Sequence, residues 1–130
     1  MTAAIDTVLA TARTRLERLD AYDAAAAAAA GALLVDIRPE INRVTEGAIP
    51  GAIVIDRNVL EWRLDPASDA RIEQASCDAW IVLFCNEGYA SSLAATSLQD
   101  LGVIAATDMI GGYRAWRAAG LPTMEIGEDG

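Results

Sequence analysis

The chain has 130 residues, of which 53% are hydrophobic and 22% charged, and this is enough for one domain with its own apolar core. Its formal net charge is −9, so we expect neither nucleic acid nor a membrane surface as a partner, because both are bound through a basic face. All ten cationic side chains are Arg, and the chain has neither Lys nor His. These absences exclude a Ser-His-Asp or Cys-His pair, a His-ligated metal, a lysine Schiff base and a P-loop lysine.

No apolar stretch approaches the roughly 20 residues that a membrane-spanning helix needs. The N-terminus also lacks a basic region followed by an apolar block, which is the pattern of a secretory signal peptide. We therefore expect a cytoplasmic protein. Heavy use of Ala and Arg without Lys is typical of GC-rich coding sequences and points to a bacterial source.

Two helices are predicted at the start of the chain. Over residues 3–20 the apolar side chains follow helical spacing, and most of the charged side chains lie outside that stripe. We expect this helix to pack on the flank of the domain or on a neighbouring chain, where it offers a surface for an oligomer. A second, Ala-rich helix is predicted over roughly 23–30, and Gly31 ends it.

Strands and helices alternate in the rest of the chain. Short apolar runs predict strands at residues 33–37, 53–55, 80–85 and 107–110. Helical stretches are predicted at about 57–62, 69–75, 91–101 and 113–119. This alternation predicts an α/β fold with a doubly wound parallel β-sheet flanked by helices. The helix at 3–20 is then an extra N-terminal element.

Cys85 is the most informative residue. It closes the apolar run 80–85, the next residues read as a tight loop, and Ser91 opens a helix that stops at Gly102. A thiol between a buried strand and a helix N-terminus sits where unpaired N–H groups and the helix dipole stabilise a thiolate. Ligands of open α/β sheets bind at the same edge. Taken alone, a Cys in an apolar run is more often an inert core residue.

Cys77 is the second cysteine, and it does not form a Cys-x-x-Cys pair with Cys85. If residues 80–85 are extended, the two sulfurs lie roughly 20 Å apart, which is far beyond disulfide reach. We expect Cys77 to be a bystander near the start of the strand.

Four short motifs, in the right order and at suitable spacing, resemble those of the rhodanese-like domain. The first is the Asp-x-Arg strand end at residues 34–38, and the second is the Gly-Ala-Ile-Pro-Gly-Ala turn at 47–52, with Ala48 in place of the family's His. The third is the active loop Cys-x-x-Gly-x-Arg-Ser at 85–91, with Ala90 in place of Arg, and the fourth is Gly-Gly-x-x-x-Trp at 111–116. The resemblance divides the single domain, 1–130, into an N-terminal helix, 3–20, and a rhodanese-like part, 21–126.

The resemblance implies a sulfurtransferase. Cys85 would take a sulfane sulfur from a small-molecule or protein-bound donor and pass it, as a persulfide, to a thiol or cyanide acceptor. It implies no metal and no cofactor other than the covalent persulfide on Cys85. The backbone amides of the loop would hold the sulfur anion; these are the amides of Asn86, Glu87, Gly88, Tyr89, Ala90 and Ser91. In this loop Gly88 would supply a positive φ and Ser91 a helix cap.

Two features of the loop depart from the family pattern: Ala90 removes a cation and Glu87 adds a negative charge. Like charges about 4 Å apart repel by roughly 4 kcal/mol at an effective dielectric of about 20, and by less in salt. We therefore predict poor use of thiosulfate, a dianion, and better use of a neutral or protein-bound persulfide. Arg57 and Arg63 are candidates for a compensating cation, unless they form only surface ion pairs.

Asp36 and Arg38 lie at the end of the first predicted strand. Their structural role would be to tie neighbouring loops together, and their functional role would be to orient the active loop. We favour the structural role.

Three other functions are weighed against the sulfurtransferase. A low-activity binding or sulfur- and redox-sensing module is favoured by the missing loop Arg, whereas the Cys, Gly and Ser of the loop favour the enzyme. Sensing through a sulfenic acid on Cys85 is a related alternative. Phosphatase activity is not expected, because the related cell-cycle phosphatases grip phosphate with the Arg of a longer Cys-x5-Arg loop.

Overall fold

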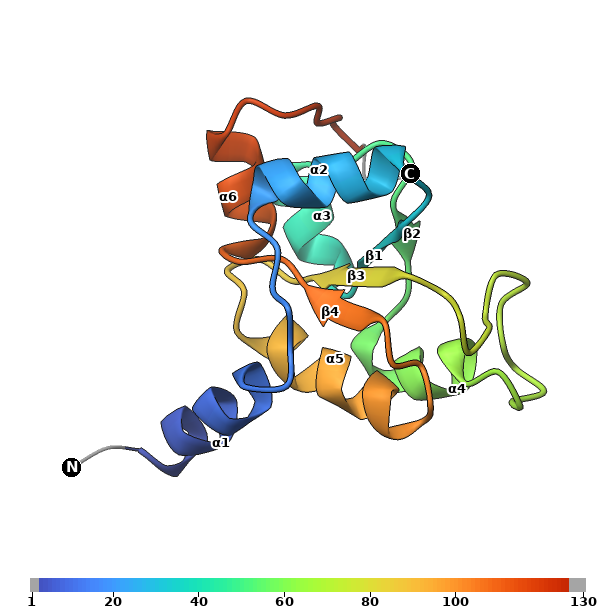
Figure 1. Cartoon of the computed structure of the whole chain (residues 1–130). Helices are drawn as coiled ribbons and strands as arrows, with labels where there is room; N and C mark the ends of the chain where they lie inside the picture. Colours follow the sequence, from blue (N-terminus) through green and yellow to red (C-terminus); the bar gives the residue numbers. More distant parts are fainter. Residues whose placement is uncertain (1–2, 127–130) are drawn as a thin grey trace.

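The computed structural model describes residues 3–126 and contains a four-stranded sheet, with all neighbouring strands parallel, in the order β2-β1-β3-β4 (Figure 1). The strands are β1 (Leu33–Asp36), β2 (Ile53–Val54), β3 (Ile81–Phe84) and β4 (Ala106–Asp108). The central strand β3 is apolar along its whole length because both faces of the sheet are covered, so every one of its side chains is buried.

Helices cover both faces of this sheet, as Figure 1 shows. They are α1 (Ala4–Arg13), α2 (Ala21–Ala29), α3 (Glu40–Glu46), α4 (Leu60–Leu64) after the short 3-10 helix η1 (Arg57–Val59), α5 (Ala90–Asp100) and α6 (Gly112–Ala118). One core cluster joins α4 and α5 to the sheet, and the other joins α2 and α6 to the opposite face. The predicted α/β class with an extra N-terminal helix is therefore confirmed.

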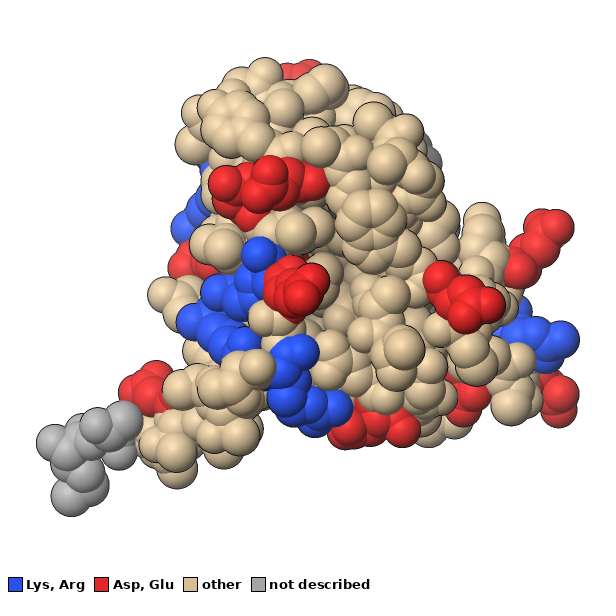
Figure 2. Space-filling view, viewed as in Figure 1, with Lys and Arg blue, Asp and Glu red and all other residues tan. Residues whose placement is uncertain are grey.

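The N-terminal helix is shorter than the predicted 3–20, because α1 ends at Arg13. The following segment instead runs along β4, the edge strand: Leu19 N–H donates to the Asp108 carbonyl (3.1 Å), and Ile110 N–H donates to the Leu19 carbonyl (2.8 Å). An edge strand has unpaired backbone N–H and C=O groups. Here the segment after α1 forms hydrogen bonds with these groups of β4 instead of continuing the helix. Figure 2 shows arginine side chains gathered where α1 joins the rest of the molecule.

The helix predicted over 69–75 is wrong, since this stretch is a series of turns. Side chains just before it bind nearby backbone groups: Asp65 accepts from Ala67 N–H (2.9 Å) and Ser68 accepts from Ala70 N–H (3.1 Å). Such local bonds favour turns over a helix. Among the helices of residues 3–126, none is long and apolar enough to cross a membrane.

Candidate active site

Cys85 lies directly after β3, at the carboxyl edge of the sheet, where parallel α/β sheets place their ligands. Its side chain is half-buried and opens into a cavity of about 610 Å³. The walls of this cavity come from the loop after β3, the segment after β1, η1 and the start of α6. The predicted nucleophile is therefore neither sealed in the core nor freely exposed.

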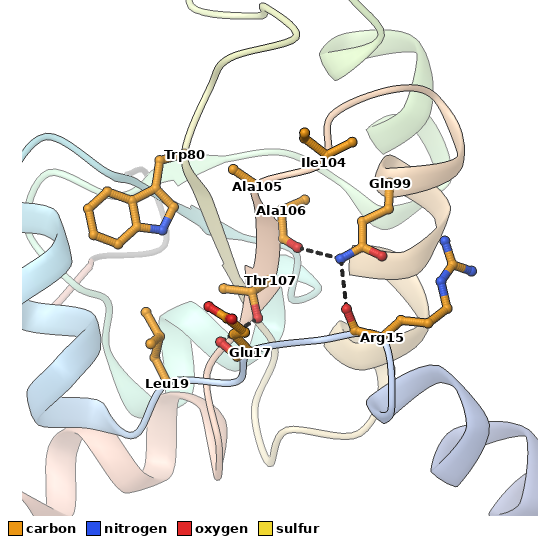
Figure 3. Close-up of a pocket in the computed structure, with 9 residues that line it drawn as sticks. All are labelled: Arg15, Glu17, Leu19, Trp80, Gln99, Ile104, Ala105, Ala106 and Thr107. Carbon is orange, nitrogen blue, oxygen red and sulfur yellow. Dashed lines mark hydrogen bonds between the residues drawn. The ribbon is translucent and has the colours of Figure 1, made fainter.

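A second cavity, of about 380 Å³, lies near the start of β3 and β4 (Figure 3). Gln99 bridges its walls, because Nε2 donates to the carbonyls of Ala106 (3.1 Å) and Arg15 (3.2 Å). Trp80 also lines this cavity and precedes β3, whereas Cys85 follows that strand. No cysteine is among the residues that line it, whereas Cys85 lines the larger cavity.

Gly88 presents its backbone N–H to the Cys85 thiol. The distance from this nitrogen to Cys85 Sγ is 3.2 Å, and it is the one backbone N–H bonded to that sulfur within residues 3–126. Gly88 has φ +88°, and a Cβ on it would lie 2.7 Å from the backbone nitrogen of Gly111. A side chain at this position would therefore meet both strain and a clash, so the loop geometry requires glycine.

Ser91 lies beside the thiol but does not cap α5. The helix begins at Ala90 with no side-chain capping bond, so the predicted cap is wrong. Instead the Ser91 hydroxyl donates to Asp108 Oδ2 (2.8 Å) and accepts from the Cys85 thiol, with 3.4 Å between Oγ and Sγ. Ser91 thus links the thiol to a carboxylate at the end of β4.

Asp108 is fully buried, and the sequence analysis did not identify it as a site residue. Arg18 donates to both of its oxygens, from Nε to Oδ1 (2.8 Å) and from Nη2 to Oδ2 (3.2 Å), and Ser92 donates to Oδ2 (2.8 Å). A buried carboxylate needs such partners, and here they offset its desolvation. The predicted strand at 107–110 places Asp108 inside a strand, whereas β4 ends at Asp108, at the same sheet edge as Cys85.

Arg13 and Arg18 also contact the active loop. Both donate to the carbonyl of Gly88, from Arg13 Nη2 (2.7 Å) and from Arg18 Nη2 (2.9 Å). Arg13 further donates from Nε to the Ser92 hydroxyl (3.1 Å) and lies 5.7 Å from the centre of the Tyr89 ring. Both arginines lie outside the apolar stripe of the helix predicted at 3–20, and no sequence motif pointed to them as site residues.

Arg38 is buried beneath the loop, together with Asp36. Its guanidinium pairs with Asp36 (2.7 Å) and donates to the carbonyl of Gly47 (2.9 Å) and to Asn86 Oδ1 (3.2 Å). It also stacks on the ring of Tyr113, with 4.1 Å to the ring centre. The pair ties the end of β1 to a neighbouring turn and contacts the active loop through Asn86, as its structural role predicts, and its orienting role stays a prediction.

Of the two candidate cations, Arg57 lines the cavity and Arg63 does not. Arg57 Nη1 pairs with Glu61 (2.8 Å), whereas Arg63 donates to the carbonyl of Ala70 (2.6 Å) on an exposed turn. Burial raises the pKa of Glu61, but hydrogen bonds from Ser97 and Arg57 outweigh this, and the pKa lies below its ordinary value. Glu61 therefore stays ionised beside Arg57.

Glu87 is not a free negative charge, since it pairs with Arg114 (2.7 Å). Arg114 also pairs with Glu46 (3.0 Å), and Glu46 accepts from the side-chain amide of Asn86 (2.8 Å). Hydrogen bonds from Arg114 and Asn86 lower the pKa of Glu46 from 4.5 to about 2. This cluster of Glu46, Glu87 and Arg114 carries two carboxylates against one guanidinium, and Glu87 and Arg114 line the cavity. Ala90, also on the cavity wall, adds no charge.

Cys77 is exposed and lies in the turns before β3, away from the cavity around Cys85. Within residues 3–126, no group of three or more Cys, Asp or Glu side chains is placed to hold a metal ion.

Comparisons with known proteins place the chain in a family. The family model of the rhodanese-like domain matches residues 19–119. A maize protein named adenylyltransferase and sulfurtransferase MOCS3-1 is 33% identical over 84 residues. These are 65% of this chain but only 18% of the maize protein, so the chain spans less than a fifth of that relative.

Two solved structures share nearly their whole length with the chain. A protein of unknown function from Rhodopseudomonas palustris CGA009, named as a possible tyrosine phosphatase, has a TM-score of 0.84 and 34% identity, over 95% of this chain and 96% of that one. The human single-domain sulfurtransferase TSTD1 has a TM-score of 0.67 and 27% identity, over 78% of this chain and 95% of that one.

Proposed function

We propose that this chain, which belongs to the rhodanese-like domain family, is a sulfurtransferase that works through a persulfide on Cys85. The family, with sulfurtransferases among its relatives, supports the general activity. The observation that carries the finer proposal is the half-buried Cys85 thiol, open to a cavity and met by the N–H of Gly88 at 3.2 Å.

The reaction proceeds in two displacements. The Cys85 thiolate attacks the outer sulfur of a donor persulfide; a new S–S bond forms, the donor's S–S bond breaks, and its electron pair leaves with the donor thiolate. An acceptor thiolate, or cyanide, then attacks the outer sulfur on Cys85 and regenerates the Cys85 thiolate. Neither displacement needs a metal or a separate cofactor.

Two groups stabilise the sulfur anion in this scheme. The Gly88 N–H already points at Sγ, and a hydrogen bond to an ionised acceptor is roughly twice as strong as a neutral one. The Ser91 hydroxyl accepts from the neutral thiol; after ionisation it turns its proton from Asp108 to the sulfur. Asp108 keeps its bonds from Arg18 and Ser92 when this happens.

The preferred donor is a neutral or protein-bound persulfide rather than thiosulfate. Three arginines, Arg38, Arg57 and Arg114, line the cavity together with two carboxylates, Asp56 and Glu87, and Ala90 offers no cation. Arg38 is already bound to Asp36, and Arg114 to Glu46, from outside the lining. Arg57 is the cavity cation that can face an anionic donor, although Glu61 already holds one of its nitrogens. The positive charge at the cavity is therefore smaller than the two negative charges of thiosulfate.

Intact-mass spectrometry tests the proposal. After incubation with a sulfane-sulfur donor we expect an adduct of about 32 Da, one sulfur atom, that cyanide or dithiothreitol removes. The adduct must be absent in Cys85→Ser and retained in Cys77→Ser, which controls for the exposed thiol. An adduct of about 16 Da would instead favour sensing through a sulfenic acid, and no adduct would favour a binding module. The absence of a loop Arg is the observation that favours these alternatives. Hydrolysis of p-nitrophenyl phosphate would point to a phosphatase.

A further inference from the structure

We propose that Arg13 and Arg18 are positioning residues for the Cys85 loop, and that they supply from behind it the positive charge that Ala90 does not supply from within. Both precede residues 19–119, the part that matches the family, so this device belongs to the N-terminal segment of this chain. The inference rests on the proposed function only in taking Cys85 as the reacting sulfur.

Gly88 lies between the two arginines and the Cys85 thiol. Its N–H meets Cys85 Sγ at 3.2 Å, and its carbonyl receives Arg13 at 2.7 Å and Arg18 at 2.9 Å. Glycine at φ +88° has wide backbone freedom and no side chain to hold it. The two guanidinium bonds therefore fix the conformation in which the N–H points at the sulfur.

The same bonds orient the next amide. The peptide between Gly88 and Tyr89 is trans, so the Tyr89 N–H points opposite to the carbonyl that the arginines hold. Tyr89 lines the cavity of Cys85, and this N–H is therefore directed away from the arginines. Two cations on the carbonyl polarise the peptide and strengthen the N–H as a donor. We assign it to the outer sulfur of the persulfide.

Arg18 has a second effect through Asp108. It binds both carboxylate oxygens, at 2.8 and 3.2 Å, and Ser92 binds Oδ2. Asp108 therefore stays satisfied when Ser91 turns its proton toward the sulfur. Without Arg18, the buried Asp108 carboxylate would bind the Ser91 hydroxyl proton more tightly. The Ser91 oxygen would then present only its lone pairs to the sulfur anion, which would not be stabilised by them.

The charges behind the loop do not cancel. Arg18 is balanced by Asp108, but within residues 3–126 no carboxylate pairs with Arg13, whose bonds run to Gly88 and Ser92. Arg13 is half-buried, so solvent screens it only in part. One net positive charge, that of Arg13, thus stands on the side of the loop where the Gly88 carbonyl lies.

Alkylation of Cys85 by iodoacetamide tests the proposal, in a Cys77→Ser background so that one thiol reacts. Arg13→Ala should lower the rate about tenfold at about pH 7, because the thiolate loses stabilising groups. The deficit should shrink to less than about twofold near pH 10, where a free thiol is ionised in any case. Arg13→Lys should recover part of the rate, since an ammonium can still bind one carbonyl.

Arg15→Ala is the matched control, because Arg15 lies in the same segment but pairs with Asp100 on the surface. It should alkylate at the wild-type rate. Arg13→Ala leaves no buried carboxylate unpaired, so it should fold, and its melting temperature reports this. A wild-type rate in Arg13→Ala, or a deficit that persists near pH 10, would overturn the proposal. Alkylation of Cys85 does not require sulfur transfer. The alkylation rates therefore test the role of Arg13 even if the persulfide adduct of the proposed function fails to form.

Discussion

Arg57 is the cation at the cavity wall whose guanidinium is only partly engaged by the protein. Within residues 3–126, both of its hydrogen bonds use Nη1, to the two carboxylate oxygens of Glu61 at 2.8 and 3.0 Å. The side chain is 40% exposed, so its remaining nitrogens can reach a bound anion. Arg38 has no such freedom, because its guanidinium is buried and bound to Asp36, Gly47 and Asn86.

We predict that Arg57→Ala lowers kcat/KM for thiosulfate about tenfold, because one charge-assisted contact to the donor is lost. A neutral persulfide donor does not use that contact, and its kcat/KM should change less than about twofold. Arg63→Ala is the control: Arg63 lies outside the cavity and should leave both donors unaffected. Equal losses for the two donors in Arg57→Ala would show that Arg57 acts on the fold of the site rather than on the charge of the donor.

At the scale of elements, Glu46 connects three parts of the molecule. It ends α3, accepts from Asn86 in the active loop and pairs with Arg114 on α6. Its side chain is 14% exposed, whereas Glu87, which pairs with the same Arg114, is 53% exposed. Water therefore screens the Glu87–Arg114 ion pair more strongly, and the Glu46–Arg114 ion pair contributes more to stability.

The lowered pKa of Glu46 makes stability depend on pH in a defined direction. Since hydrogen bonds from Arg114 and Asn86 lower this pKa from 4.5 to about 2, the folded state favours the carboxylate. The stabilisation is complete above about pH 5 and is lost as the pH falls toward the folded value. Because Arg114 is half-exposed, we expect about 1 kcal/mol rather than the full linkage value.

Urea unfolding of Glu46→Gln should therefore show a free energy of unfolding about 1 kcal/mol below wild type at about pH 7. The gap should narrow steadily on acidification, since wild-type Glu46 is then protonated too. Glu87→Gln, with the same partner but greater exposure, should lose less than about 0.5 kcal/mol. A gap for Glu46→Gln that does not change with pH would contradict a role of its charge.

The sequence was sufficient to predict the strands, the parallel sheet and the place of Cys85, because these depend on apolar runs and on residues close together in the chain. It was not sufficient to predict where α1 stops. The pairing of Leu19 with β4 depends on an open sheet edge that forms only when residues 106–108 are in place. The same long-range pairing brings Arg18 to Asp108, and no local pattern encodes that contact.

The sequence also could not show which of two arginines, Arg57 or Arg63, lines the cavity. Arg57 and Arg63 lie six positions apart, and the spacing alone favours neither as the cavity cation. Asp56 caps η1 by accepting from Asn58 N–H, and Arg57, the first residue of η1, lies at the cavity wall. Arg63 lies on α4, and a carbonyl in the turns that replaced the predicted 69–75 helix binds it.

The whole molecule carries a net charge of −9, and its arginines are mostly engaged by carboxylates or backbone carbonyls. In Figure 2 the acidic side chains lie at many places on the visible face, while the arginines are gathered at a few. An anionic donor therefore approaches against a repulsive field, whereas a neutral donor does not experience it. The contacts that we propose for Arg57, Arg13 and Arg18 would act only at short range.

A change in ionic strength distinguishes the long-range repulsion by the net charge from the short-range contacts of the arginines. Raising it from about 10 mM to about 150 mM shortens the Debye length from about 30 Å to about 8 Å, which screens the net charge but only partly screens contacts inside the cavity. We predict that kcat/KM for thiosulfate rises about threefold over this range, because the repulsion during approach is removed. The neutral persulfide donor, measured in the same buffers, should change less than about 1.5-fold. A fall for thiosulfate would mean that attraction by local arginines, and not the acidic surface, governs the encounter.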